Sequence, residues 1–162
     1  MHSIKEREKM GLLNCVVYLI IVGIITFIGG RIFPRKWIKE NKFPFESFKF
    51  EKNGKIYDKI KIKKWKTKLP DASCVLYKIM PKKRIETKSI KKIEILVKES
   101  CIAEATHVIV GVLSWLCIYI WKKRNGFLVA LFFNILNLPF ILIQRYNRPR
   151  LKKVLKINSM SC

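Results

Sequence analysis

Acidic residues are scarce in this chain of 162 residues, which has 11 Asp+Glu against 34 Lys+Arg and a formal net charge of +23. Histidine is also rare, with two residues, and the five cysteines include no Cys-x-x-Cys pair. An odd number of cysteines, two or three of them in apolar runs, argues against a disulfide framework or a zinc site. Half of the residues are nevertheless hydrophobic, a combination that is unusual for a soluble protein.

Basic and hydrophobic residues are separated along the chain. Apolar runs occupy 12–33, 107–121 and 127–143, whereas 34–98 holds 21 Lys+Arg against 7 Asp+Glu. A helix of about 20 residues crosses the hydrocarbon core of a bilayer at ~1.5 Å rise per residue. The sequence therefore predicts a mainly α integral membrane protein, with about three transmembrane helices and a basic cytoplasmic segment. A secretory signal is the rival interpretation of the first run, but the run is longer than a usual signal core.

Five segments of one membrane domain, 1–162, follow from this pattern. They are a helix at 12–33, a basic cytoplasmic segment at 34–88, an amphipathic helix running into a second span at 89–121, a third helix at 127–147 and a basic tail at 148–162. The basic segment is expected to hold short helical or irregular pieces. Gly54 to Ile60 can form a short helix, whereas the alternation from Ile60 to Lys63 suits an extended piece, and periodicity does not separate the two.

Three further local features concern one helix cap and two prolines. Ser89 is expected to cap the second long helix at its N-terminus. Pro149 biases the residue before it away from the helix, so Arg148-Pro149-Arg150 is expected to be partly extended. Pro139, inside the third apolar run, is expected to kink that span.

The distribution of basic residues predicts a multi-pass protein of the cell membrane with 34–98 and the C-terminus in the cytoplasm. The short connection 122–126 then lies outside, although a shallow re-entrant hairpin is an alternative. The mixture of basic and aromatic residues in 34–88 is also a pattern that binds nucleic acid. Beside three apolar runs, contact with the bilayer surface explains it better. We therefore expect the lipid bilayer, and no nucleic acid, as a partner.

Two polar stripes lie on the second and third predicted spans. At ~100° per residue, one sector of the second span holds a set of small and polar residues: Ser100, Ala103, Glu104, His107, Gly111 and Ser114. On the third span Asn134, Asn137 and Gln144 share a face. When the pair is folded about Asn125, His107 is level with Gln144, Glu104 with Arg145, and Ser114 with Asn137. The two stripes are therefore expected to face each other.

Ionisable groups in such a place are functional suspects, because charge is costly within a membrane. Glu104 and His107 are three residues apart and so neighbours on a helix, which allows the carboxylate to orient the imidazole. The imidazole can then take a proton from a hydroxyl during acyl transfer. The alternative is that both side chains only hydrogen-bond across the helix pair. A metal site is not expected, since Glu-x-x-His occurs once and di-metal bundles need two such motifs.

Several stretches match a known family. They are FESFKFEKNGK at 45–55, KWKTK at 64–68, ESCIAE at 99–104 with His107, and the C-terminal NLP at 137–139 and QRYNRPRL at 144–151. In these residues the chain resembles the glycosyl-4,4'-diaponeurosporenoate acyltransferases. The resemblance implies a bacterial membrane enzyme that esterifies the glucose 6-hydroxyl of a glycosylated C30 carotenoid acid with a branched fatty acyl group, the last step of staphyloxanthin synthesis.

The combined prediction is a membrane O-acyltransferase acting on a sugar hydroxyl of a glycosylated carotenoid or related glycolipid. His107 is the expected base and Glu104 orients it. Donor or acceptor binding is expected from a further set of polar residues: Glu99, Asn137, Gln144, Arg145, Asn147, Arg148 and Arg150. No bound cofactor is expected, and acyl-CoA or acyl-carrier protein is the expected donor. The alternative is a non-enzymatic membrane anchor whose basic loop binds anionic lipid or an acidic protein.

Overall fold

The computed structural model describes residues 2–68 and 90–160. This part of the chain is mainly helical, as predicted, and it divides into two compact units. The first unit comprises 1–33 and 103–141, and the second comprises 34–102 and 142–162. The expected N-cap Ser89 and the segment 72–88 lie outside the described residues.

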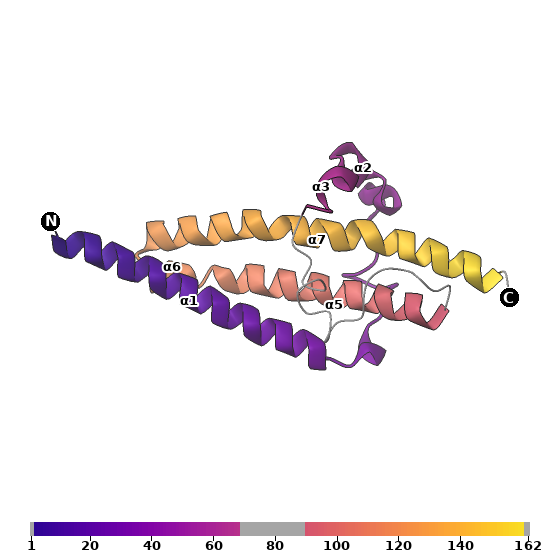
Figure 1. The fold of residues 1–162 in the computed structure, drawn as a ribbon, viewed down its shortest axis with the longest axis horizontal. Coiled ribbons are helices and arrows are strands. Elements are labelled where there is room, and N and C mark those ends of the chain that lie inside the picture. Colours follow the sequence, from indigo (N-terminus) through magenta and orange to yellow (C-terminus); the bar gives the residue numbers. More distant parts are fainter. Residues whose placement is uncertain (1, 69–89, 161–162) are drawn as a thin grey trace. The chain divides into compact units, whose positions relative to one another are not determined.

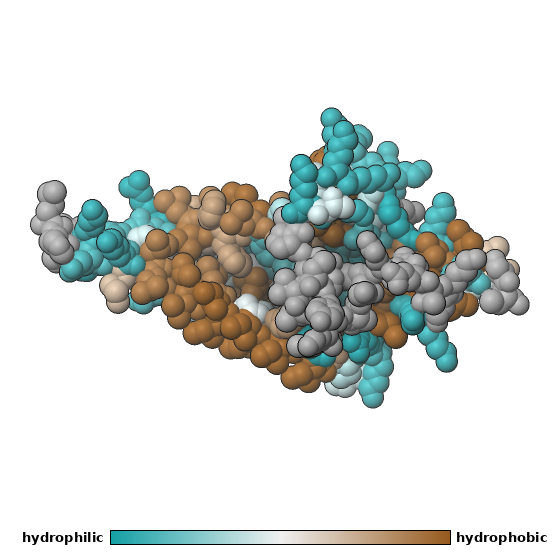
Figure 2. Space-filling model, viewed as in Figure 1, coloured by the Kyte–Doolittle hydropathy of each residue, from teal (hydrophilic) through white to brown (hydrophobic). Residues whose placement is uncertain are grey.

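Within the described residues, three helices are long and apolar enough to cross a membrane, and the candidate spans cover Lys5–Ile32, Ile90–Ile120 and Arg124–Met160. The first belongs to α1, His2–Ile32, which begins ten residues before the apolar run. The charged residues at its start are good helix formers and extend the helix. Large apolar side chains on α1 are exposed, among them Ile25 and Ile32 at 62% and 76%. In Figure 2 the surface over α1 and over the first half of α7 is correspondingly hydrophobic.

The second predicted helix is interrupted. Helix α5 spans Ile90–Ser114, and the short α6 follows at Cys117–Ile120. The carbonyl of Gly111, which an uninterrupted α-helix would pair with the N–H of Trp115, instead accepts hydrogen bonds from Ser114 Oγ at 2.6 Å and Asn134 Nδ2 at 3.2 Å. The N–H of Trp115 instead donates to the carbonyl of Val112 at 3.2 Å, as in a tighter 3₁₀ turn. Side-chain competition for one carbonyl therefore explains the break.

Helix α7, Lys123–Met160, is a single helix that continues through both Pro139 and Pro149. The expectation of a partly extended Arg148-Pro149-Arg150 is therefore wrong. Tertiary contacts outweigh the local bias: Arg148 bonds to Ser100 and to the carbonyl of Phe45, while Arg150 pairs with Asp58.

Within the first unit, α5 and the first half of α7 lie side by side in opposite directions, with α1 beside them (Figure 1). Polar contacts attach α1 to the other helices of this unit. Asn125 donates to Glu8 at 2.6 Å, Tyr18 donates to the carbonyl of Leu113 at 3.0 Å, and the buried thiol of Cys15 lies 3.8 Å from the carbonyl of Cys117. Polar groups on apolar helices are thus satisfied inside the unit.

The second unit joins α5 and α7 residues to the basic segment, whose described residues, 34–68, hold four short helical pieces. They are the 3₁₀ helices η1, Arg35–Trp37, and η2, Lys49–Gly54, and the α-helices α2, Ile56–Lys59, and α3, Ile62–Trp65. The helical alternative for residues 56–59 is therefore correct, and 60–63 is not extended. One small core packs Tyr57, Ile62 and Tyr146 together, and another packs Ile38, Cys101 and Ile102. The surface from η2 to α3 is hydrophilic (Figure 2).

Gly126 occupies a position in the first turn of α7 that leaves no room for a side chain. A Cβ placed there would lie 2.1 Å from the carbonyl oxygen of Cys117 and 2.6 Å from that of Trp121. Both obstacles are backbone atoms, so neither can rotate away. The close approach of α6 to α7 therefore requires glycine at this position.

We predict that Gly126→Ala lowers the thermal unfolding midpoint of the protein in detergent micelles, with a cost of about 1–3 kcal/mol from forced backbone displacement. Gly23→Ala is the matched control, because a Cβ at Gly23 of α1 meets nothing within 4 Å. There the alanine should raise helix stability by up to about 1 kcal/mol. Equal midpoints for the two variants would contradict the packing of α6 against α7.

Candidate active site

His107 of α5 and Asn137 of α7 form a reciprocal pair in the first unit. His107 Nδ1 lies 2.8 Å from Asn137 Oδ1, and Asn137 Nδ2 donates to the backbone carbonyl of His107 at 2.7 Å. A carboxamide oxygen only accepts, so Nδ1 of His107 carries the proton and, in the neutral ring, Nε2 carries the lone pair. The contact thereby selects the tautomer that places a basic nitrogen opposite the anchored one.

The surroundings of His107 restrict its ring further. Phe140, one turn after Asn137, stacks on the imidazole with 5.1 Å between the ring centroids and 11° between the planes. Asn137 itself is buried, with 6% of its surface exposed, and His107 is half-buried. A ring held by a hydrogen bond on one edge and an aromatic face is ordered before any substrate arrives.

Helices α5 and α7 approach each other closely enough for the side chain of Asn137 to reach His107. A Cβ at Gly111 would lie 2.8 Å from Asn134 Oδ1 and 3.3 Å from Asn137 Nδ2. Asn134 uses the space to donate to Ser114 Oγ at 2.7 Å. Small residues on α5 therefore let two asparagines of α7 reach across the helix pair.

The predicted register of these helices is shifted. Folding about Asn125 puts Ser114 level with Asn137, but the structure pairs Ser114 with Asn134 and His107 with Asn137. The cause is the connection: α7 already begins at Lys123, inside the expected loop. The predicted proximity of Glu104 to Arg145, and of His107 to Gln144, joins residues of different units and stays a prediction.

Glu104 is buried in the first unit, with 5% of its surface exposed. It lies one helical turn before His107 on α5, as the spacing requires. In the structure, Nδ1 of His107 contacts Asn137, a residue that the sequence analysis assigned to substrate binding. Orientation of the imidazole by Glu104 remains a prediction.

The arginines of the QRYNRPRL stretch, Arg145, Arg148 and Arg150, all bond to residues of the basic segment in the second unit. Arg145 donates to Glu51 Oε1 at 2.5 Å and Oε2 at 3.1 Å, and to the carbonyls of Pro44 and Glu46 at 3.2 and 3.1 Å. Its guanidinium also lies 4.3 Å from the ring centroid of Phe48. Arg145 thus fixes the path of residues 44–51 against α7.

Glu51 is the buried anion at the centre of this cluster, with 2% of its surface exposed. Burial alone would raise the pKa of its carboxyl, but hydrogen bonds from Arg145, from the Tyr57 hydroxyl and from the backbone N–H of Phe48, together with the charge of Arg145, hold that pKa below its usual range. The pKa of Tyr57 is raised, first by burial and then by its hydrogen bond to Glu51. The pair therefore stays a carboxylate and a neutral phenol at ordinary pH.

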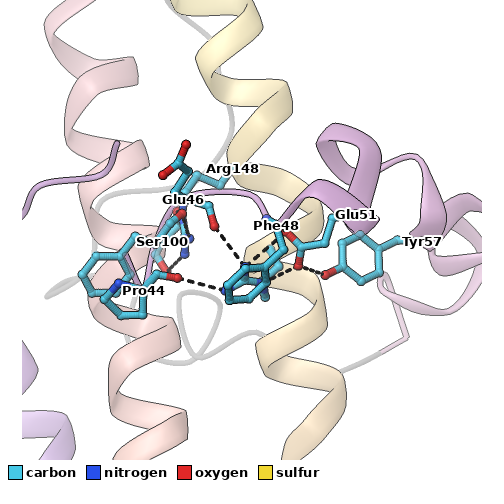
Figure 3. Close-up of polar contacts among 9 residues, drawn as sticks. Pro44, Glu46, Phe48, Glu51, Tyr57, Ser100 and Arg148 are labelled. Atoms are coloured by element: carbon cyan, nitrogen blue, oxygen red, sulfur yellow. Dashed lines mark hydrogen bonds and ion pairs between the residues drawn. The ribbon is translucent and has the colours of Figure 1, made fainter. Parts of the chain in front are cut away.

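Arg148 is the most deeply buried of the three arginines, with 3% of its surface exposed. It donates to Ser100 Oγ at 3.0 Å, to the carbonyl of Ser100 at 3.1 Å and to the carbonyl of Phe45 at 2.8 Å. Figure 3 shows this arginine reaching from α7 to α5 and to the loop that carries Pro44. These contacts explain why an arginine is required here, and binding of donor or sugar by Arg148 stays a prediction.

Three of the remaining predicted binding residues have partners in the second unit. Arg150 pairs with Asp58 at 3.2 Å and lies 3.4 Å from the ring centroid of Tyr146. Asn147 accepts a hydrogen bond from Lys66 at 3.2 Å. Glu99 accepts one from Arg35 Nε at 2.6 Å. Gln144 is half-buried on α7.

Sequence reasoning missed the roles of Glu51 and Tyr57, and it placed Asn134 on the polar stripe without assigning it to the site. Glu51 carried one available signal: it is a carboxylate in a strongly basic segment, inside the FESFKFEKNGK stretch. Buried cations need anions, so a rare acid among many bases is a candidate partner for QRYNRPRL. Among residues 2–68 and 90–160, no group of three or more His, Cys, Asp and Glu side chains is arranged to hold a metal ion.

We predict that Arg145→Lys destabilises the second unit by about 1–3 kcal/mol, because lysine cannot reproduce the two-pronged contact with buried Glu51. Arg35→Lys is the control, since the Arg35–Glu99 pair has the same chemistry but an Arg35 side chain that is 45% exposed. Exposed pairs contribute about 0–1 kcal/mol. Unfolding in detergent, followed by limited proteolysis of residues 34–66, measures both. Similar losses in the two variants would contradict a structural role for the buried pair.

Comparisons with known proteins bear on these residues. The family model described as glycosyl-4,4'-diaponeurosporenoate acyltransferase matches residues 34–157. A protein of that name from Staphylococcus aureus strain MRSA252 is 37% identical over 150 residues, which cover 88% of this chain and 87% of the relative. Another from strain N315 is 34% identical over 161 residues, covering 97% and 94%. No solved structure matches the chain. Match and identity over most of its length show that the chain belongs to the glycosyl-4,4'-diaponeurosporenoate acyltransferase family.

Proposed function

We propose that the protein is a membrane-embedded O-acyltransferase that transfers a fatty acyl group from a thioester donor to a sugar hydroxyl of a glycosylated carotenoid. Family membership supports the reaction class and, through the relatives' names, a diaponeurosporenoate glycoside as acceptor. The same membership favours an enzyme over the membrane anchor without catalysis. The observation that carries the assignment of chemistry is the reciprocal hydrogen bonding of His107 with Asn137.

The proposed step moves one proton and exchanges one bond. The sugar hydroxyl approaches Nε2 of His107, which takes its proton as the oxygen attacks the thioester carbonyl carbon. The ester C–O bond forms, the C–S bond breaks, and the imidazolium returns the proton to the departing sulfur. Asn137 keeps Nδ1 protonated and the ring in place throughout, so its role is positioning. Glu104 is proposed to support the same ring from one helical turn away.

The donor is proposed to be acyl-CoA or acyl-carrier protein, and no bound cofactor is needed for this chemistry. The excess of 21 basic over 7 acidic residues in 34–98 supports attraction of either acidic donor to the basic segment. Arg145 and Arg148 serve first to fold that segment, since their guanidiniums bond to Glu51, Ser100 and backbone carbonyls. Arg150, whose side chain is 37% exposed, is the best placed of the three to meet a phosphate as well.

We predict that His107→Gln lowers kcat by about 10²–10⁴, because glutamine keeps a hydrogen bond but cannot accept a proton and return it. Asn137→Ala should also lower kcat, by less. Asn134→Ala is the matched control: it removes the same amide from the same helix, and Asn134 also bridges to α5, but through Gly111 and Ser114. The assay is acyl transfer by purified variants of equal thermal midpoint. Equal kcat for the Asn137 and Asn134 variants would mean that Asn137 only ties two helices together.

We predict that the segment 34–98 and the C-terminus lie in the cytoplasm. In a background whose native cysteines are replaced by alanine, Lys55→Cys and Leu155→Cys should resist a membrane-impermeant thiol reagent in intact cells. Arg124→Cys, in the connection before the last span, should react and serves as the accessible control. Labelling at positions 55 and 155 would reverse the orientation, and protection at all three positions would favour the re-entrant hairpin.

A further inference from the structure

An apolar groove of about 610 Å³ lies between α1 and the first half of α7, within the first unit. Its lining is hydrocarbon along nearly its whole length, including Val16 and Ile20 of α1 and Leu128, Val129 and Phe133 of α7. On α7 the lining runs from Asn125 to Leu136, which is about 16 Å at ~1.5 Å per residue. The volume is in the range of sites that bind small organic molecules.

One end of the groove lies at Asn125 and the other at Leu136. The end at Asn125 is polar, but the amide of Asn125 already donates to Glu8 at 2.6 Å. The lining therefore suits an alkyl chain, because a polar guest would lose its hydrogen bonds to water along the groove.

The Leu136 end of the groove precedes, along α7, the residues that contact His107. Phe133, in the lining, is four residues before Asn137, and Leu136 is four residues before Phe140, so each pair shares a helix face. Asn137 bonds to His107, and Phe140 stacks on it. The Leu136 end of the groove therefore lies about one helical turn of α7 before the two residues that contact the proposed base.

We propose that this groove binds the fatty acyl chain of the donor, with the thioester carbonyl at the Leu136 end and the methyl terminus toward Asn125. The inference rests on the proposed acyl transfer at His107. The hydrocarbon of the donor begins at the reacting carbonyl carbon, so an apolar groove that ends about one helical turn from the residues holding the base suits it. The polyene of the acceptor is separated from its reacting hydroxyl by a sugar, which requires polar partners at that place. The length of the groove then limits the length of the acyl chain.

The test compares long and short donors on a variant with a shortened groove. Val129→Trp fills the middle of the groove, so kcat/KM for hexadecanoyl-CoA relative to octanoyl-CoA should fall about tenfold, which corresponds to roughly two methylene groups left unburied. Val112→Trp is the matched control, because Val112 is an exposed residue of α5 outside the lining, with 64% of its surface accessible. Its ratio should stay at the wild-type value. An unchanged ratio in Val129→Trp, or the same fall in both variants, overturns the proposal.

A binding measurement separates the groove from the reaction. A photoreactive fatty acyl-CoA should label α1 and residues 125–136 of α7 in the purified protein, and excess hexadecanoyl-CoA should remove the label. Labelling there without any acyl transfer would leave the groove in place and refute the proposed function. Label that excess phospholipid displaces equally well identifies a bilayer lipid as the occupant, and label displaced only by a glycosylated polyene identifies the acceptor. Either of these two results overturns the assignment to the donor.

Discussion

Shortage of anions is the constraint on which the second unit depends. With 34 basic and 11 acidic residues, most cations must be stabilised without a carboxylate. Glu51 serves Arg145, whereas Arg148 relies on carbonyl and hydroxyl oxygens. Lys152 takes the carbonyl of Glu40, and Arg150 adds the face of Tyr146 to its exposed pair with Asp58. Guanidinium groups suit such mixed partners because they are planar, carry five donors and are weakly hydrated. The conformation of the basic segment therefore depends on contacts between basic side chains and oxygen atoms or aromatic rings.

In the first unit the constraint is different, because apolar helices must associate with one another. In a bilayer, apolar side chains gain little free energy by contacting protein instead of lipid. Directional contacts must therefore favour the association of the helices. Asn134 and Asn137 supply them by reaching backbone carbonyls of α5, and the space comes from Gly111. One of these amides also holds an imidazole, so the contact that fixes the helix pair is shared with the proposed chemistry. Separating the two roles requires the comparison of Asn137 with Asn134.

Sequence reasoning recovered what depends on local pattern. Hydrophobic runs predicted three long helices, and polar stripes predicted that His107 and Asn137 would lie on facing surfaces of α5 and α7. It failed where distant contacts decide. Pro149 favours an extended chain locally, but Arg148 and Arg150 hold the helix on either side of it. The break after Ser114 depends on which donors compete for one carbonyl, and the burial of Glu51 depends on an arginine 94 residues away. Neither is encoded in periodicity.

The hydrogen bonds of the turn between α6 and α7 bear on the cost of placing this helix pair in a bilayer. The carbonyl of Trp121 accepts the N–H of Gly126 at 2.9 Å, and the carbonyl of Lys122 accepts that of Asn125 at 2.9 Å. The carbonyl of Cys117 is likewise taken, by the N–H of Trp121 at 3.0 Å. These three carbonyls have partners within the chain, which lowers the cost of placing the turn in hydrocarbon. In a bilayer, a larger cost would come from charge, because residues 122–124, which join the two helices, are three successive basic residues.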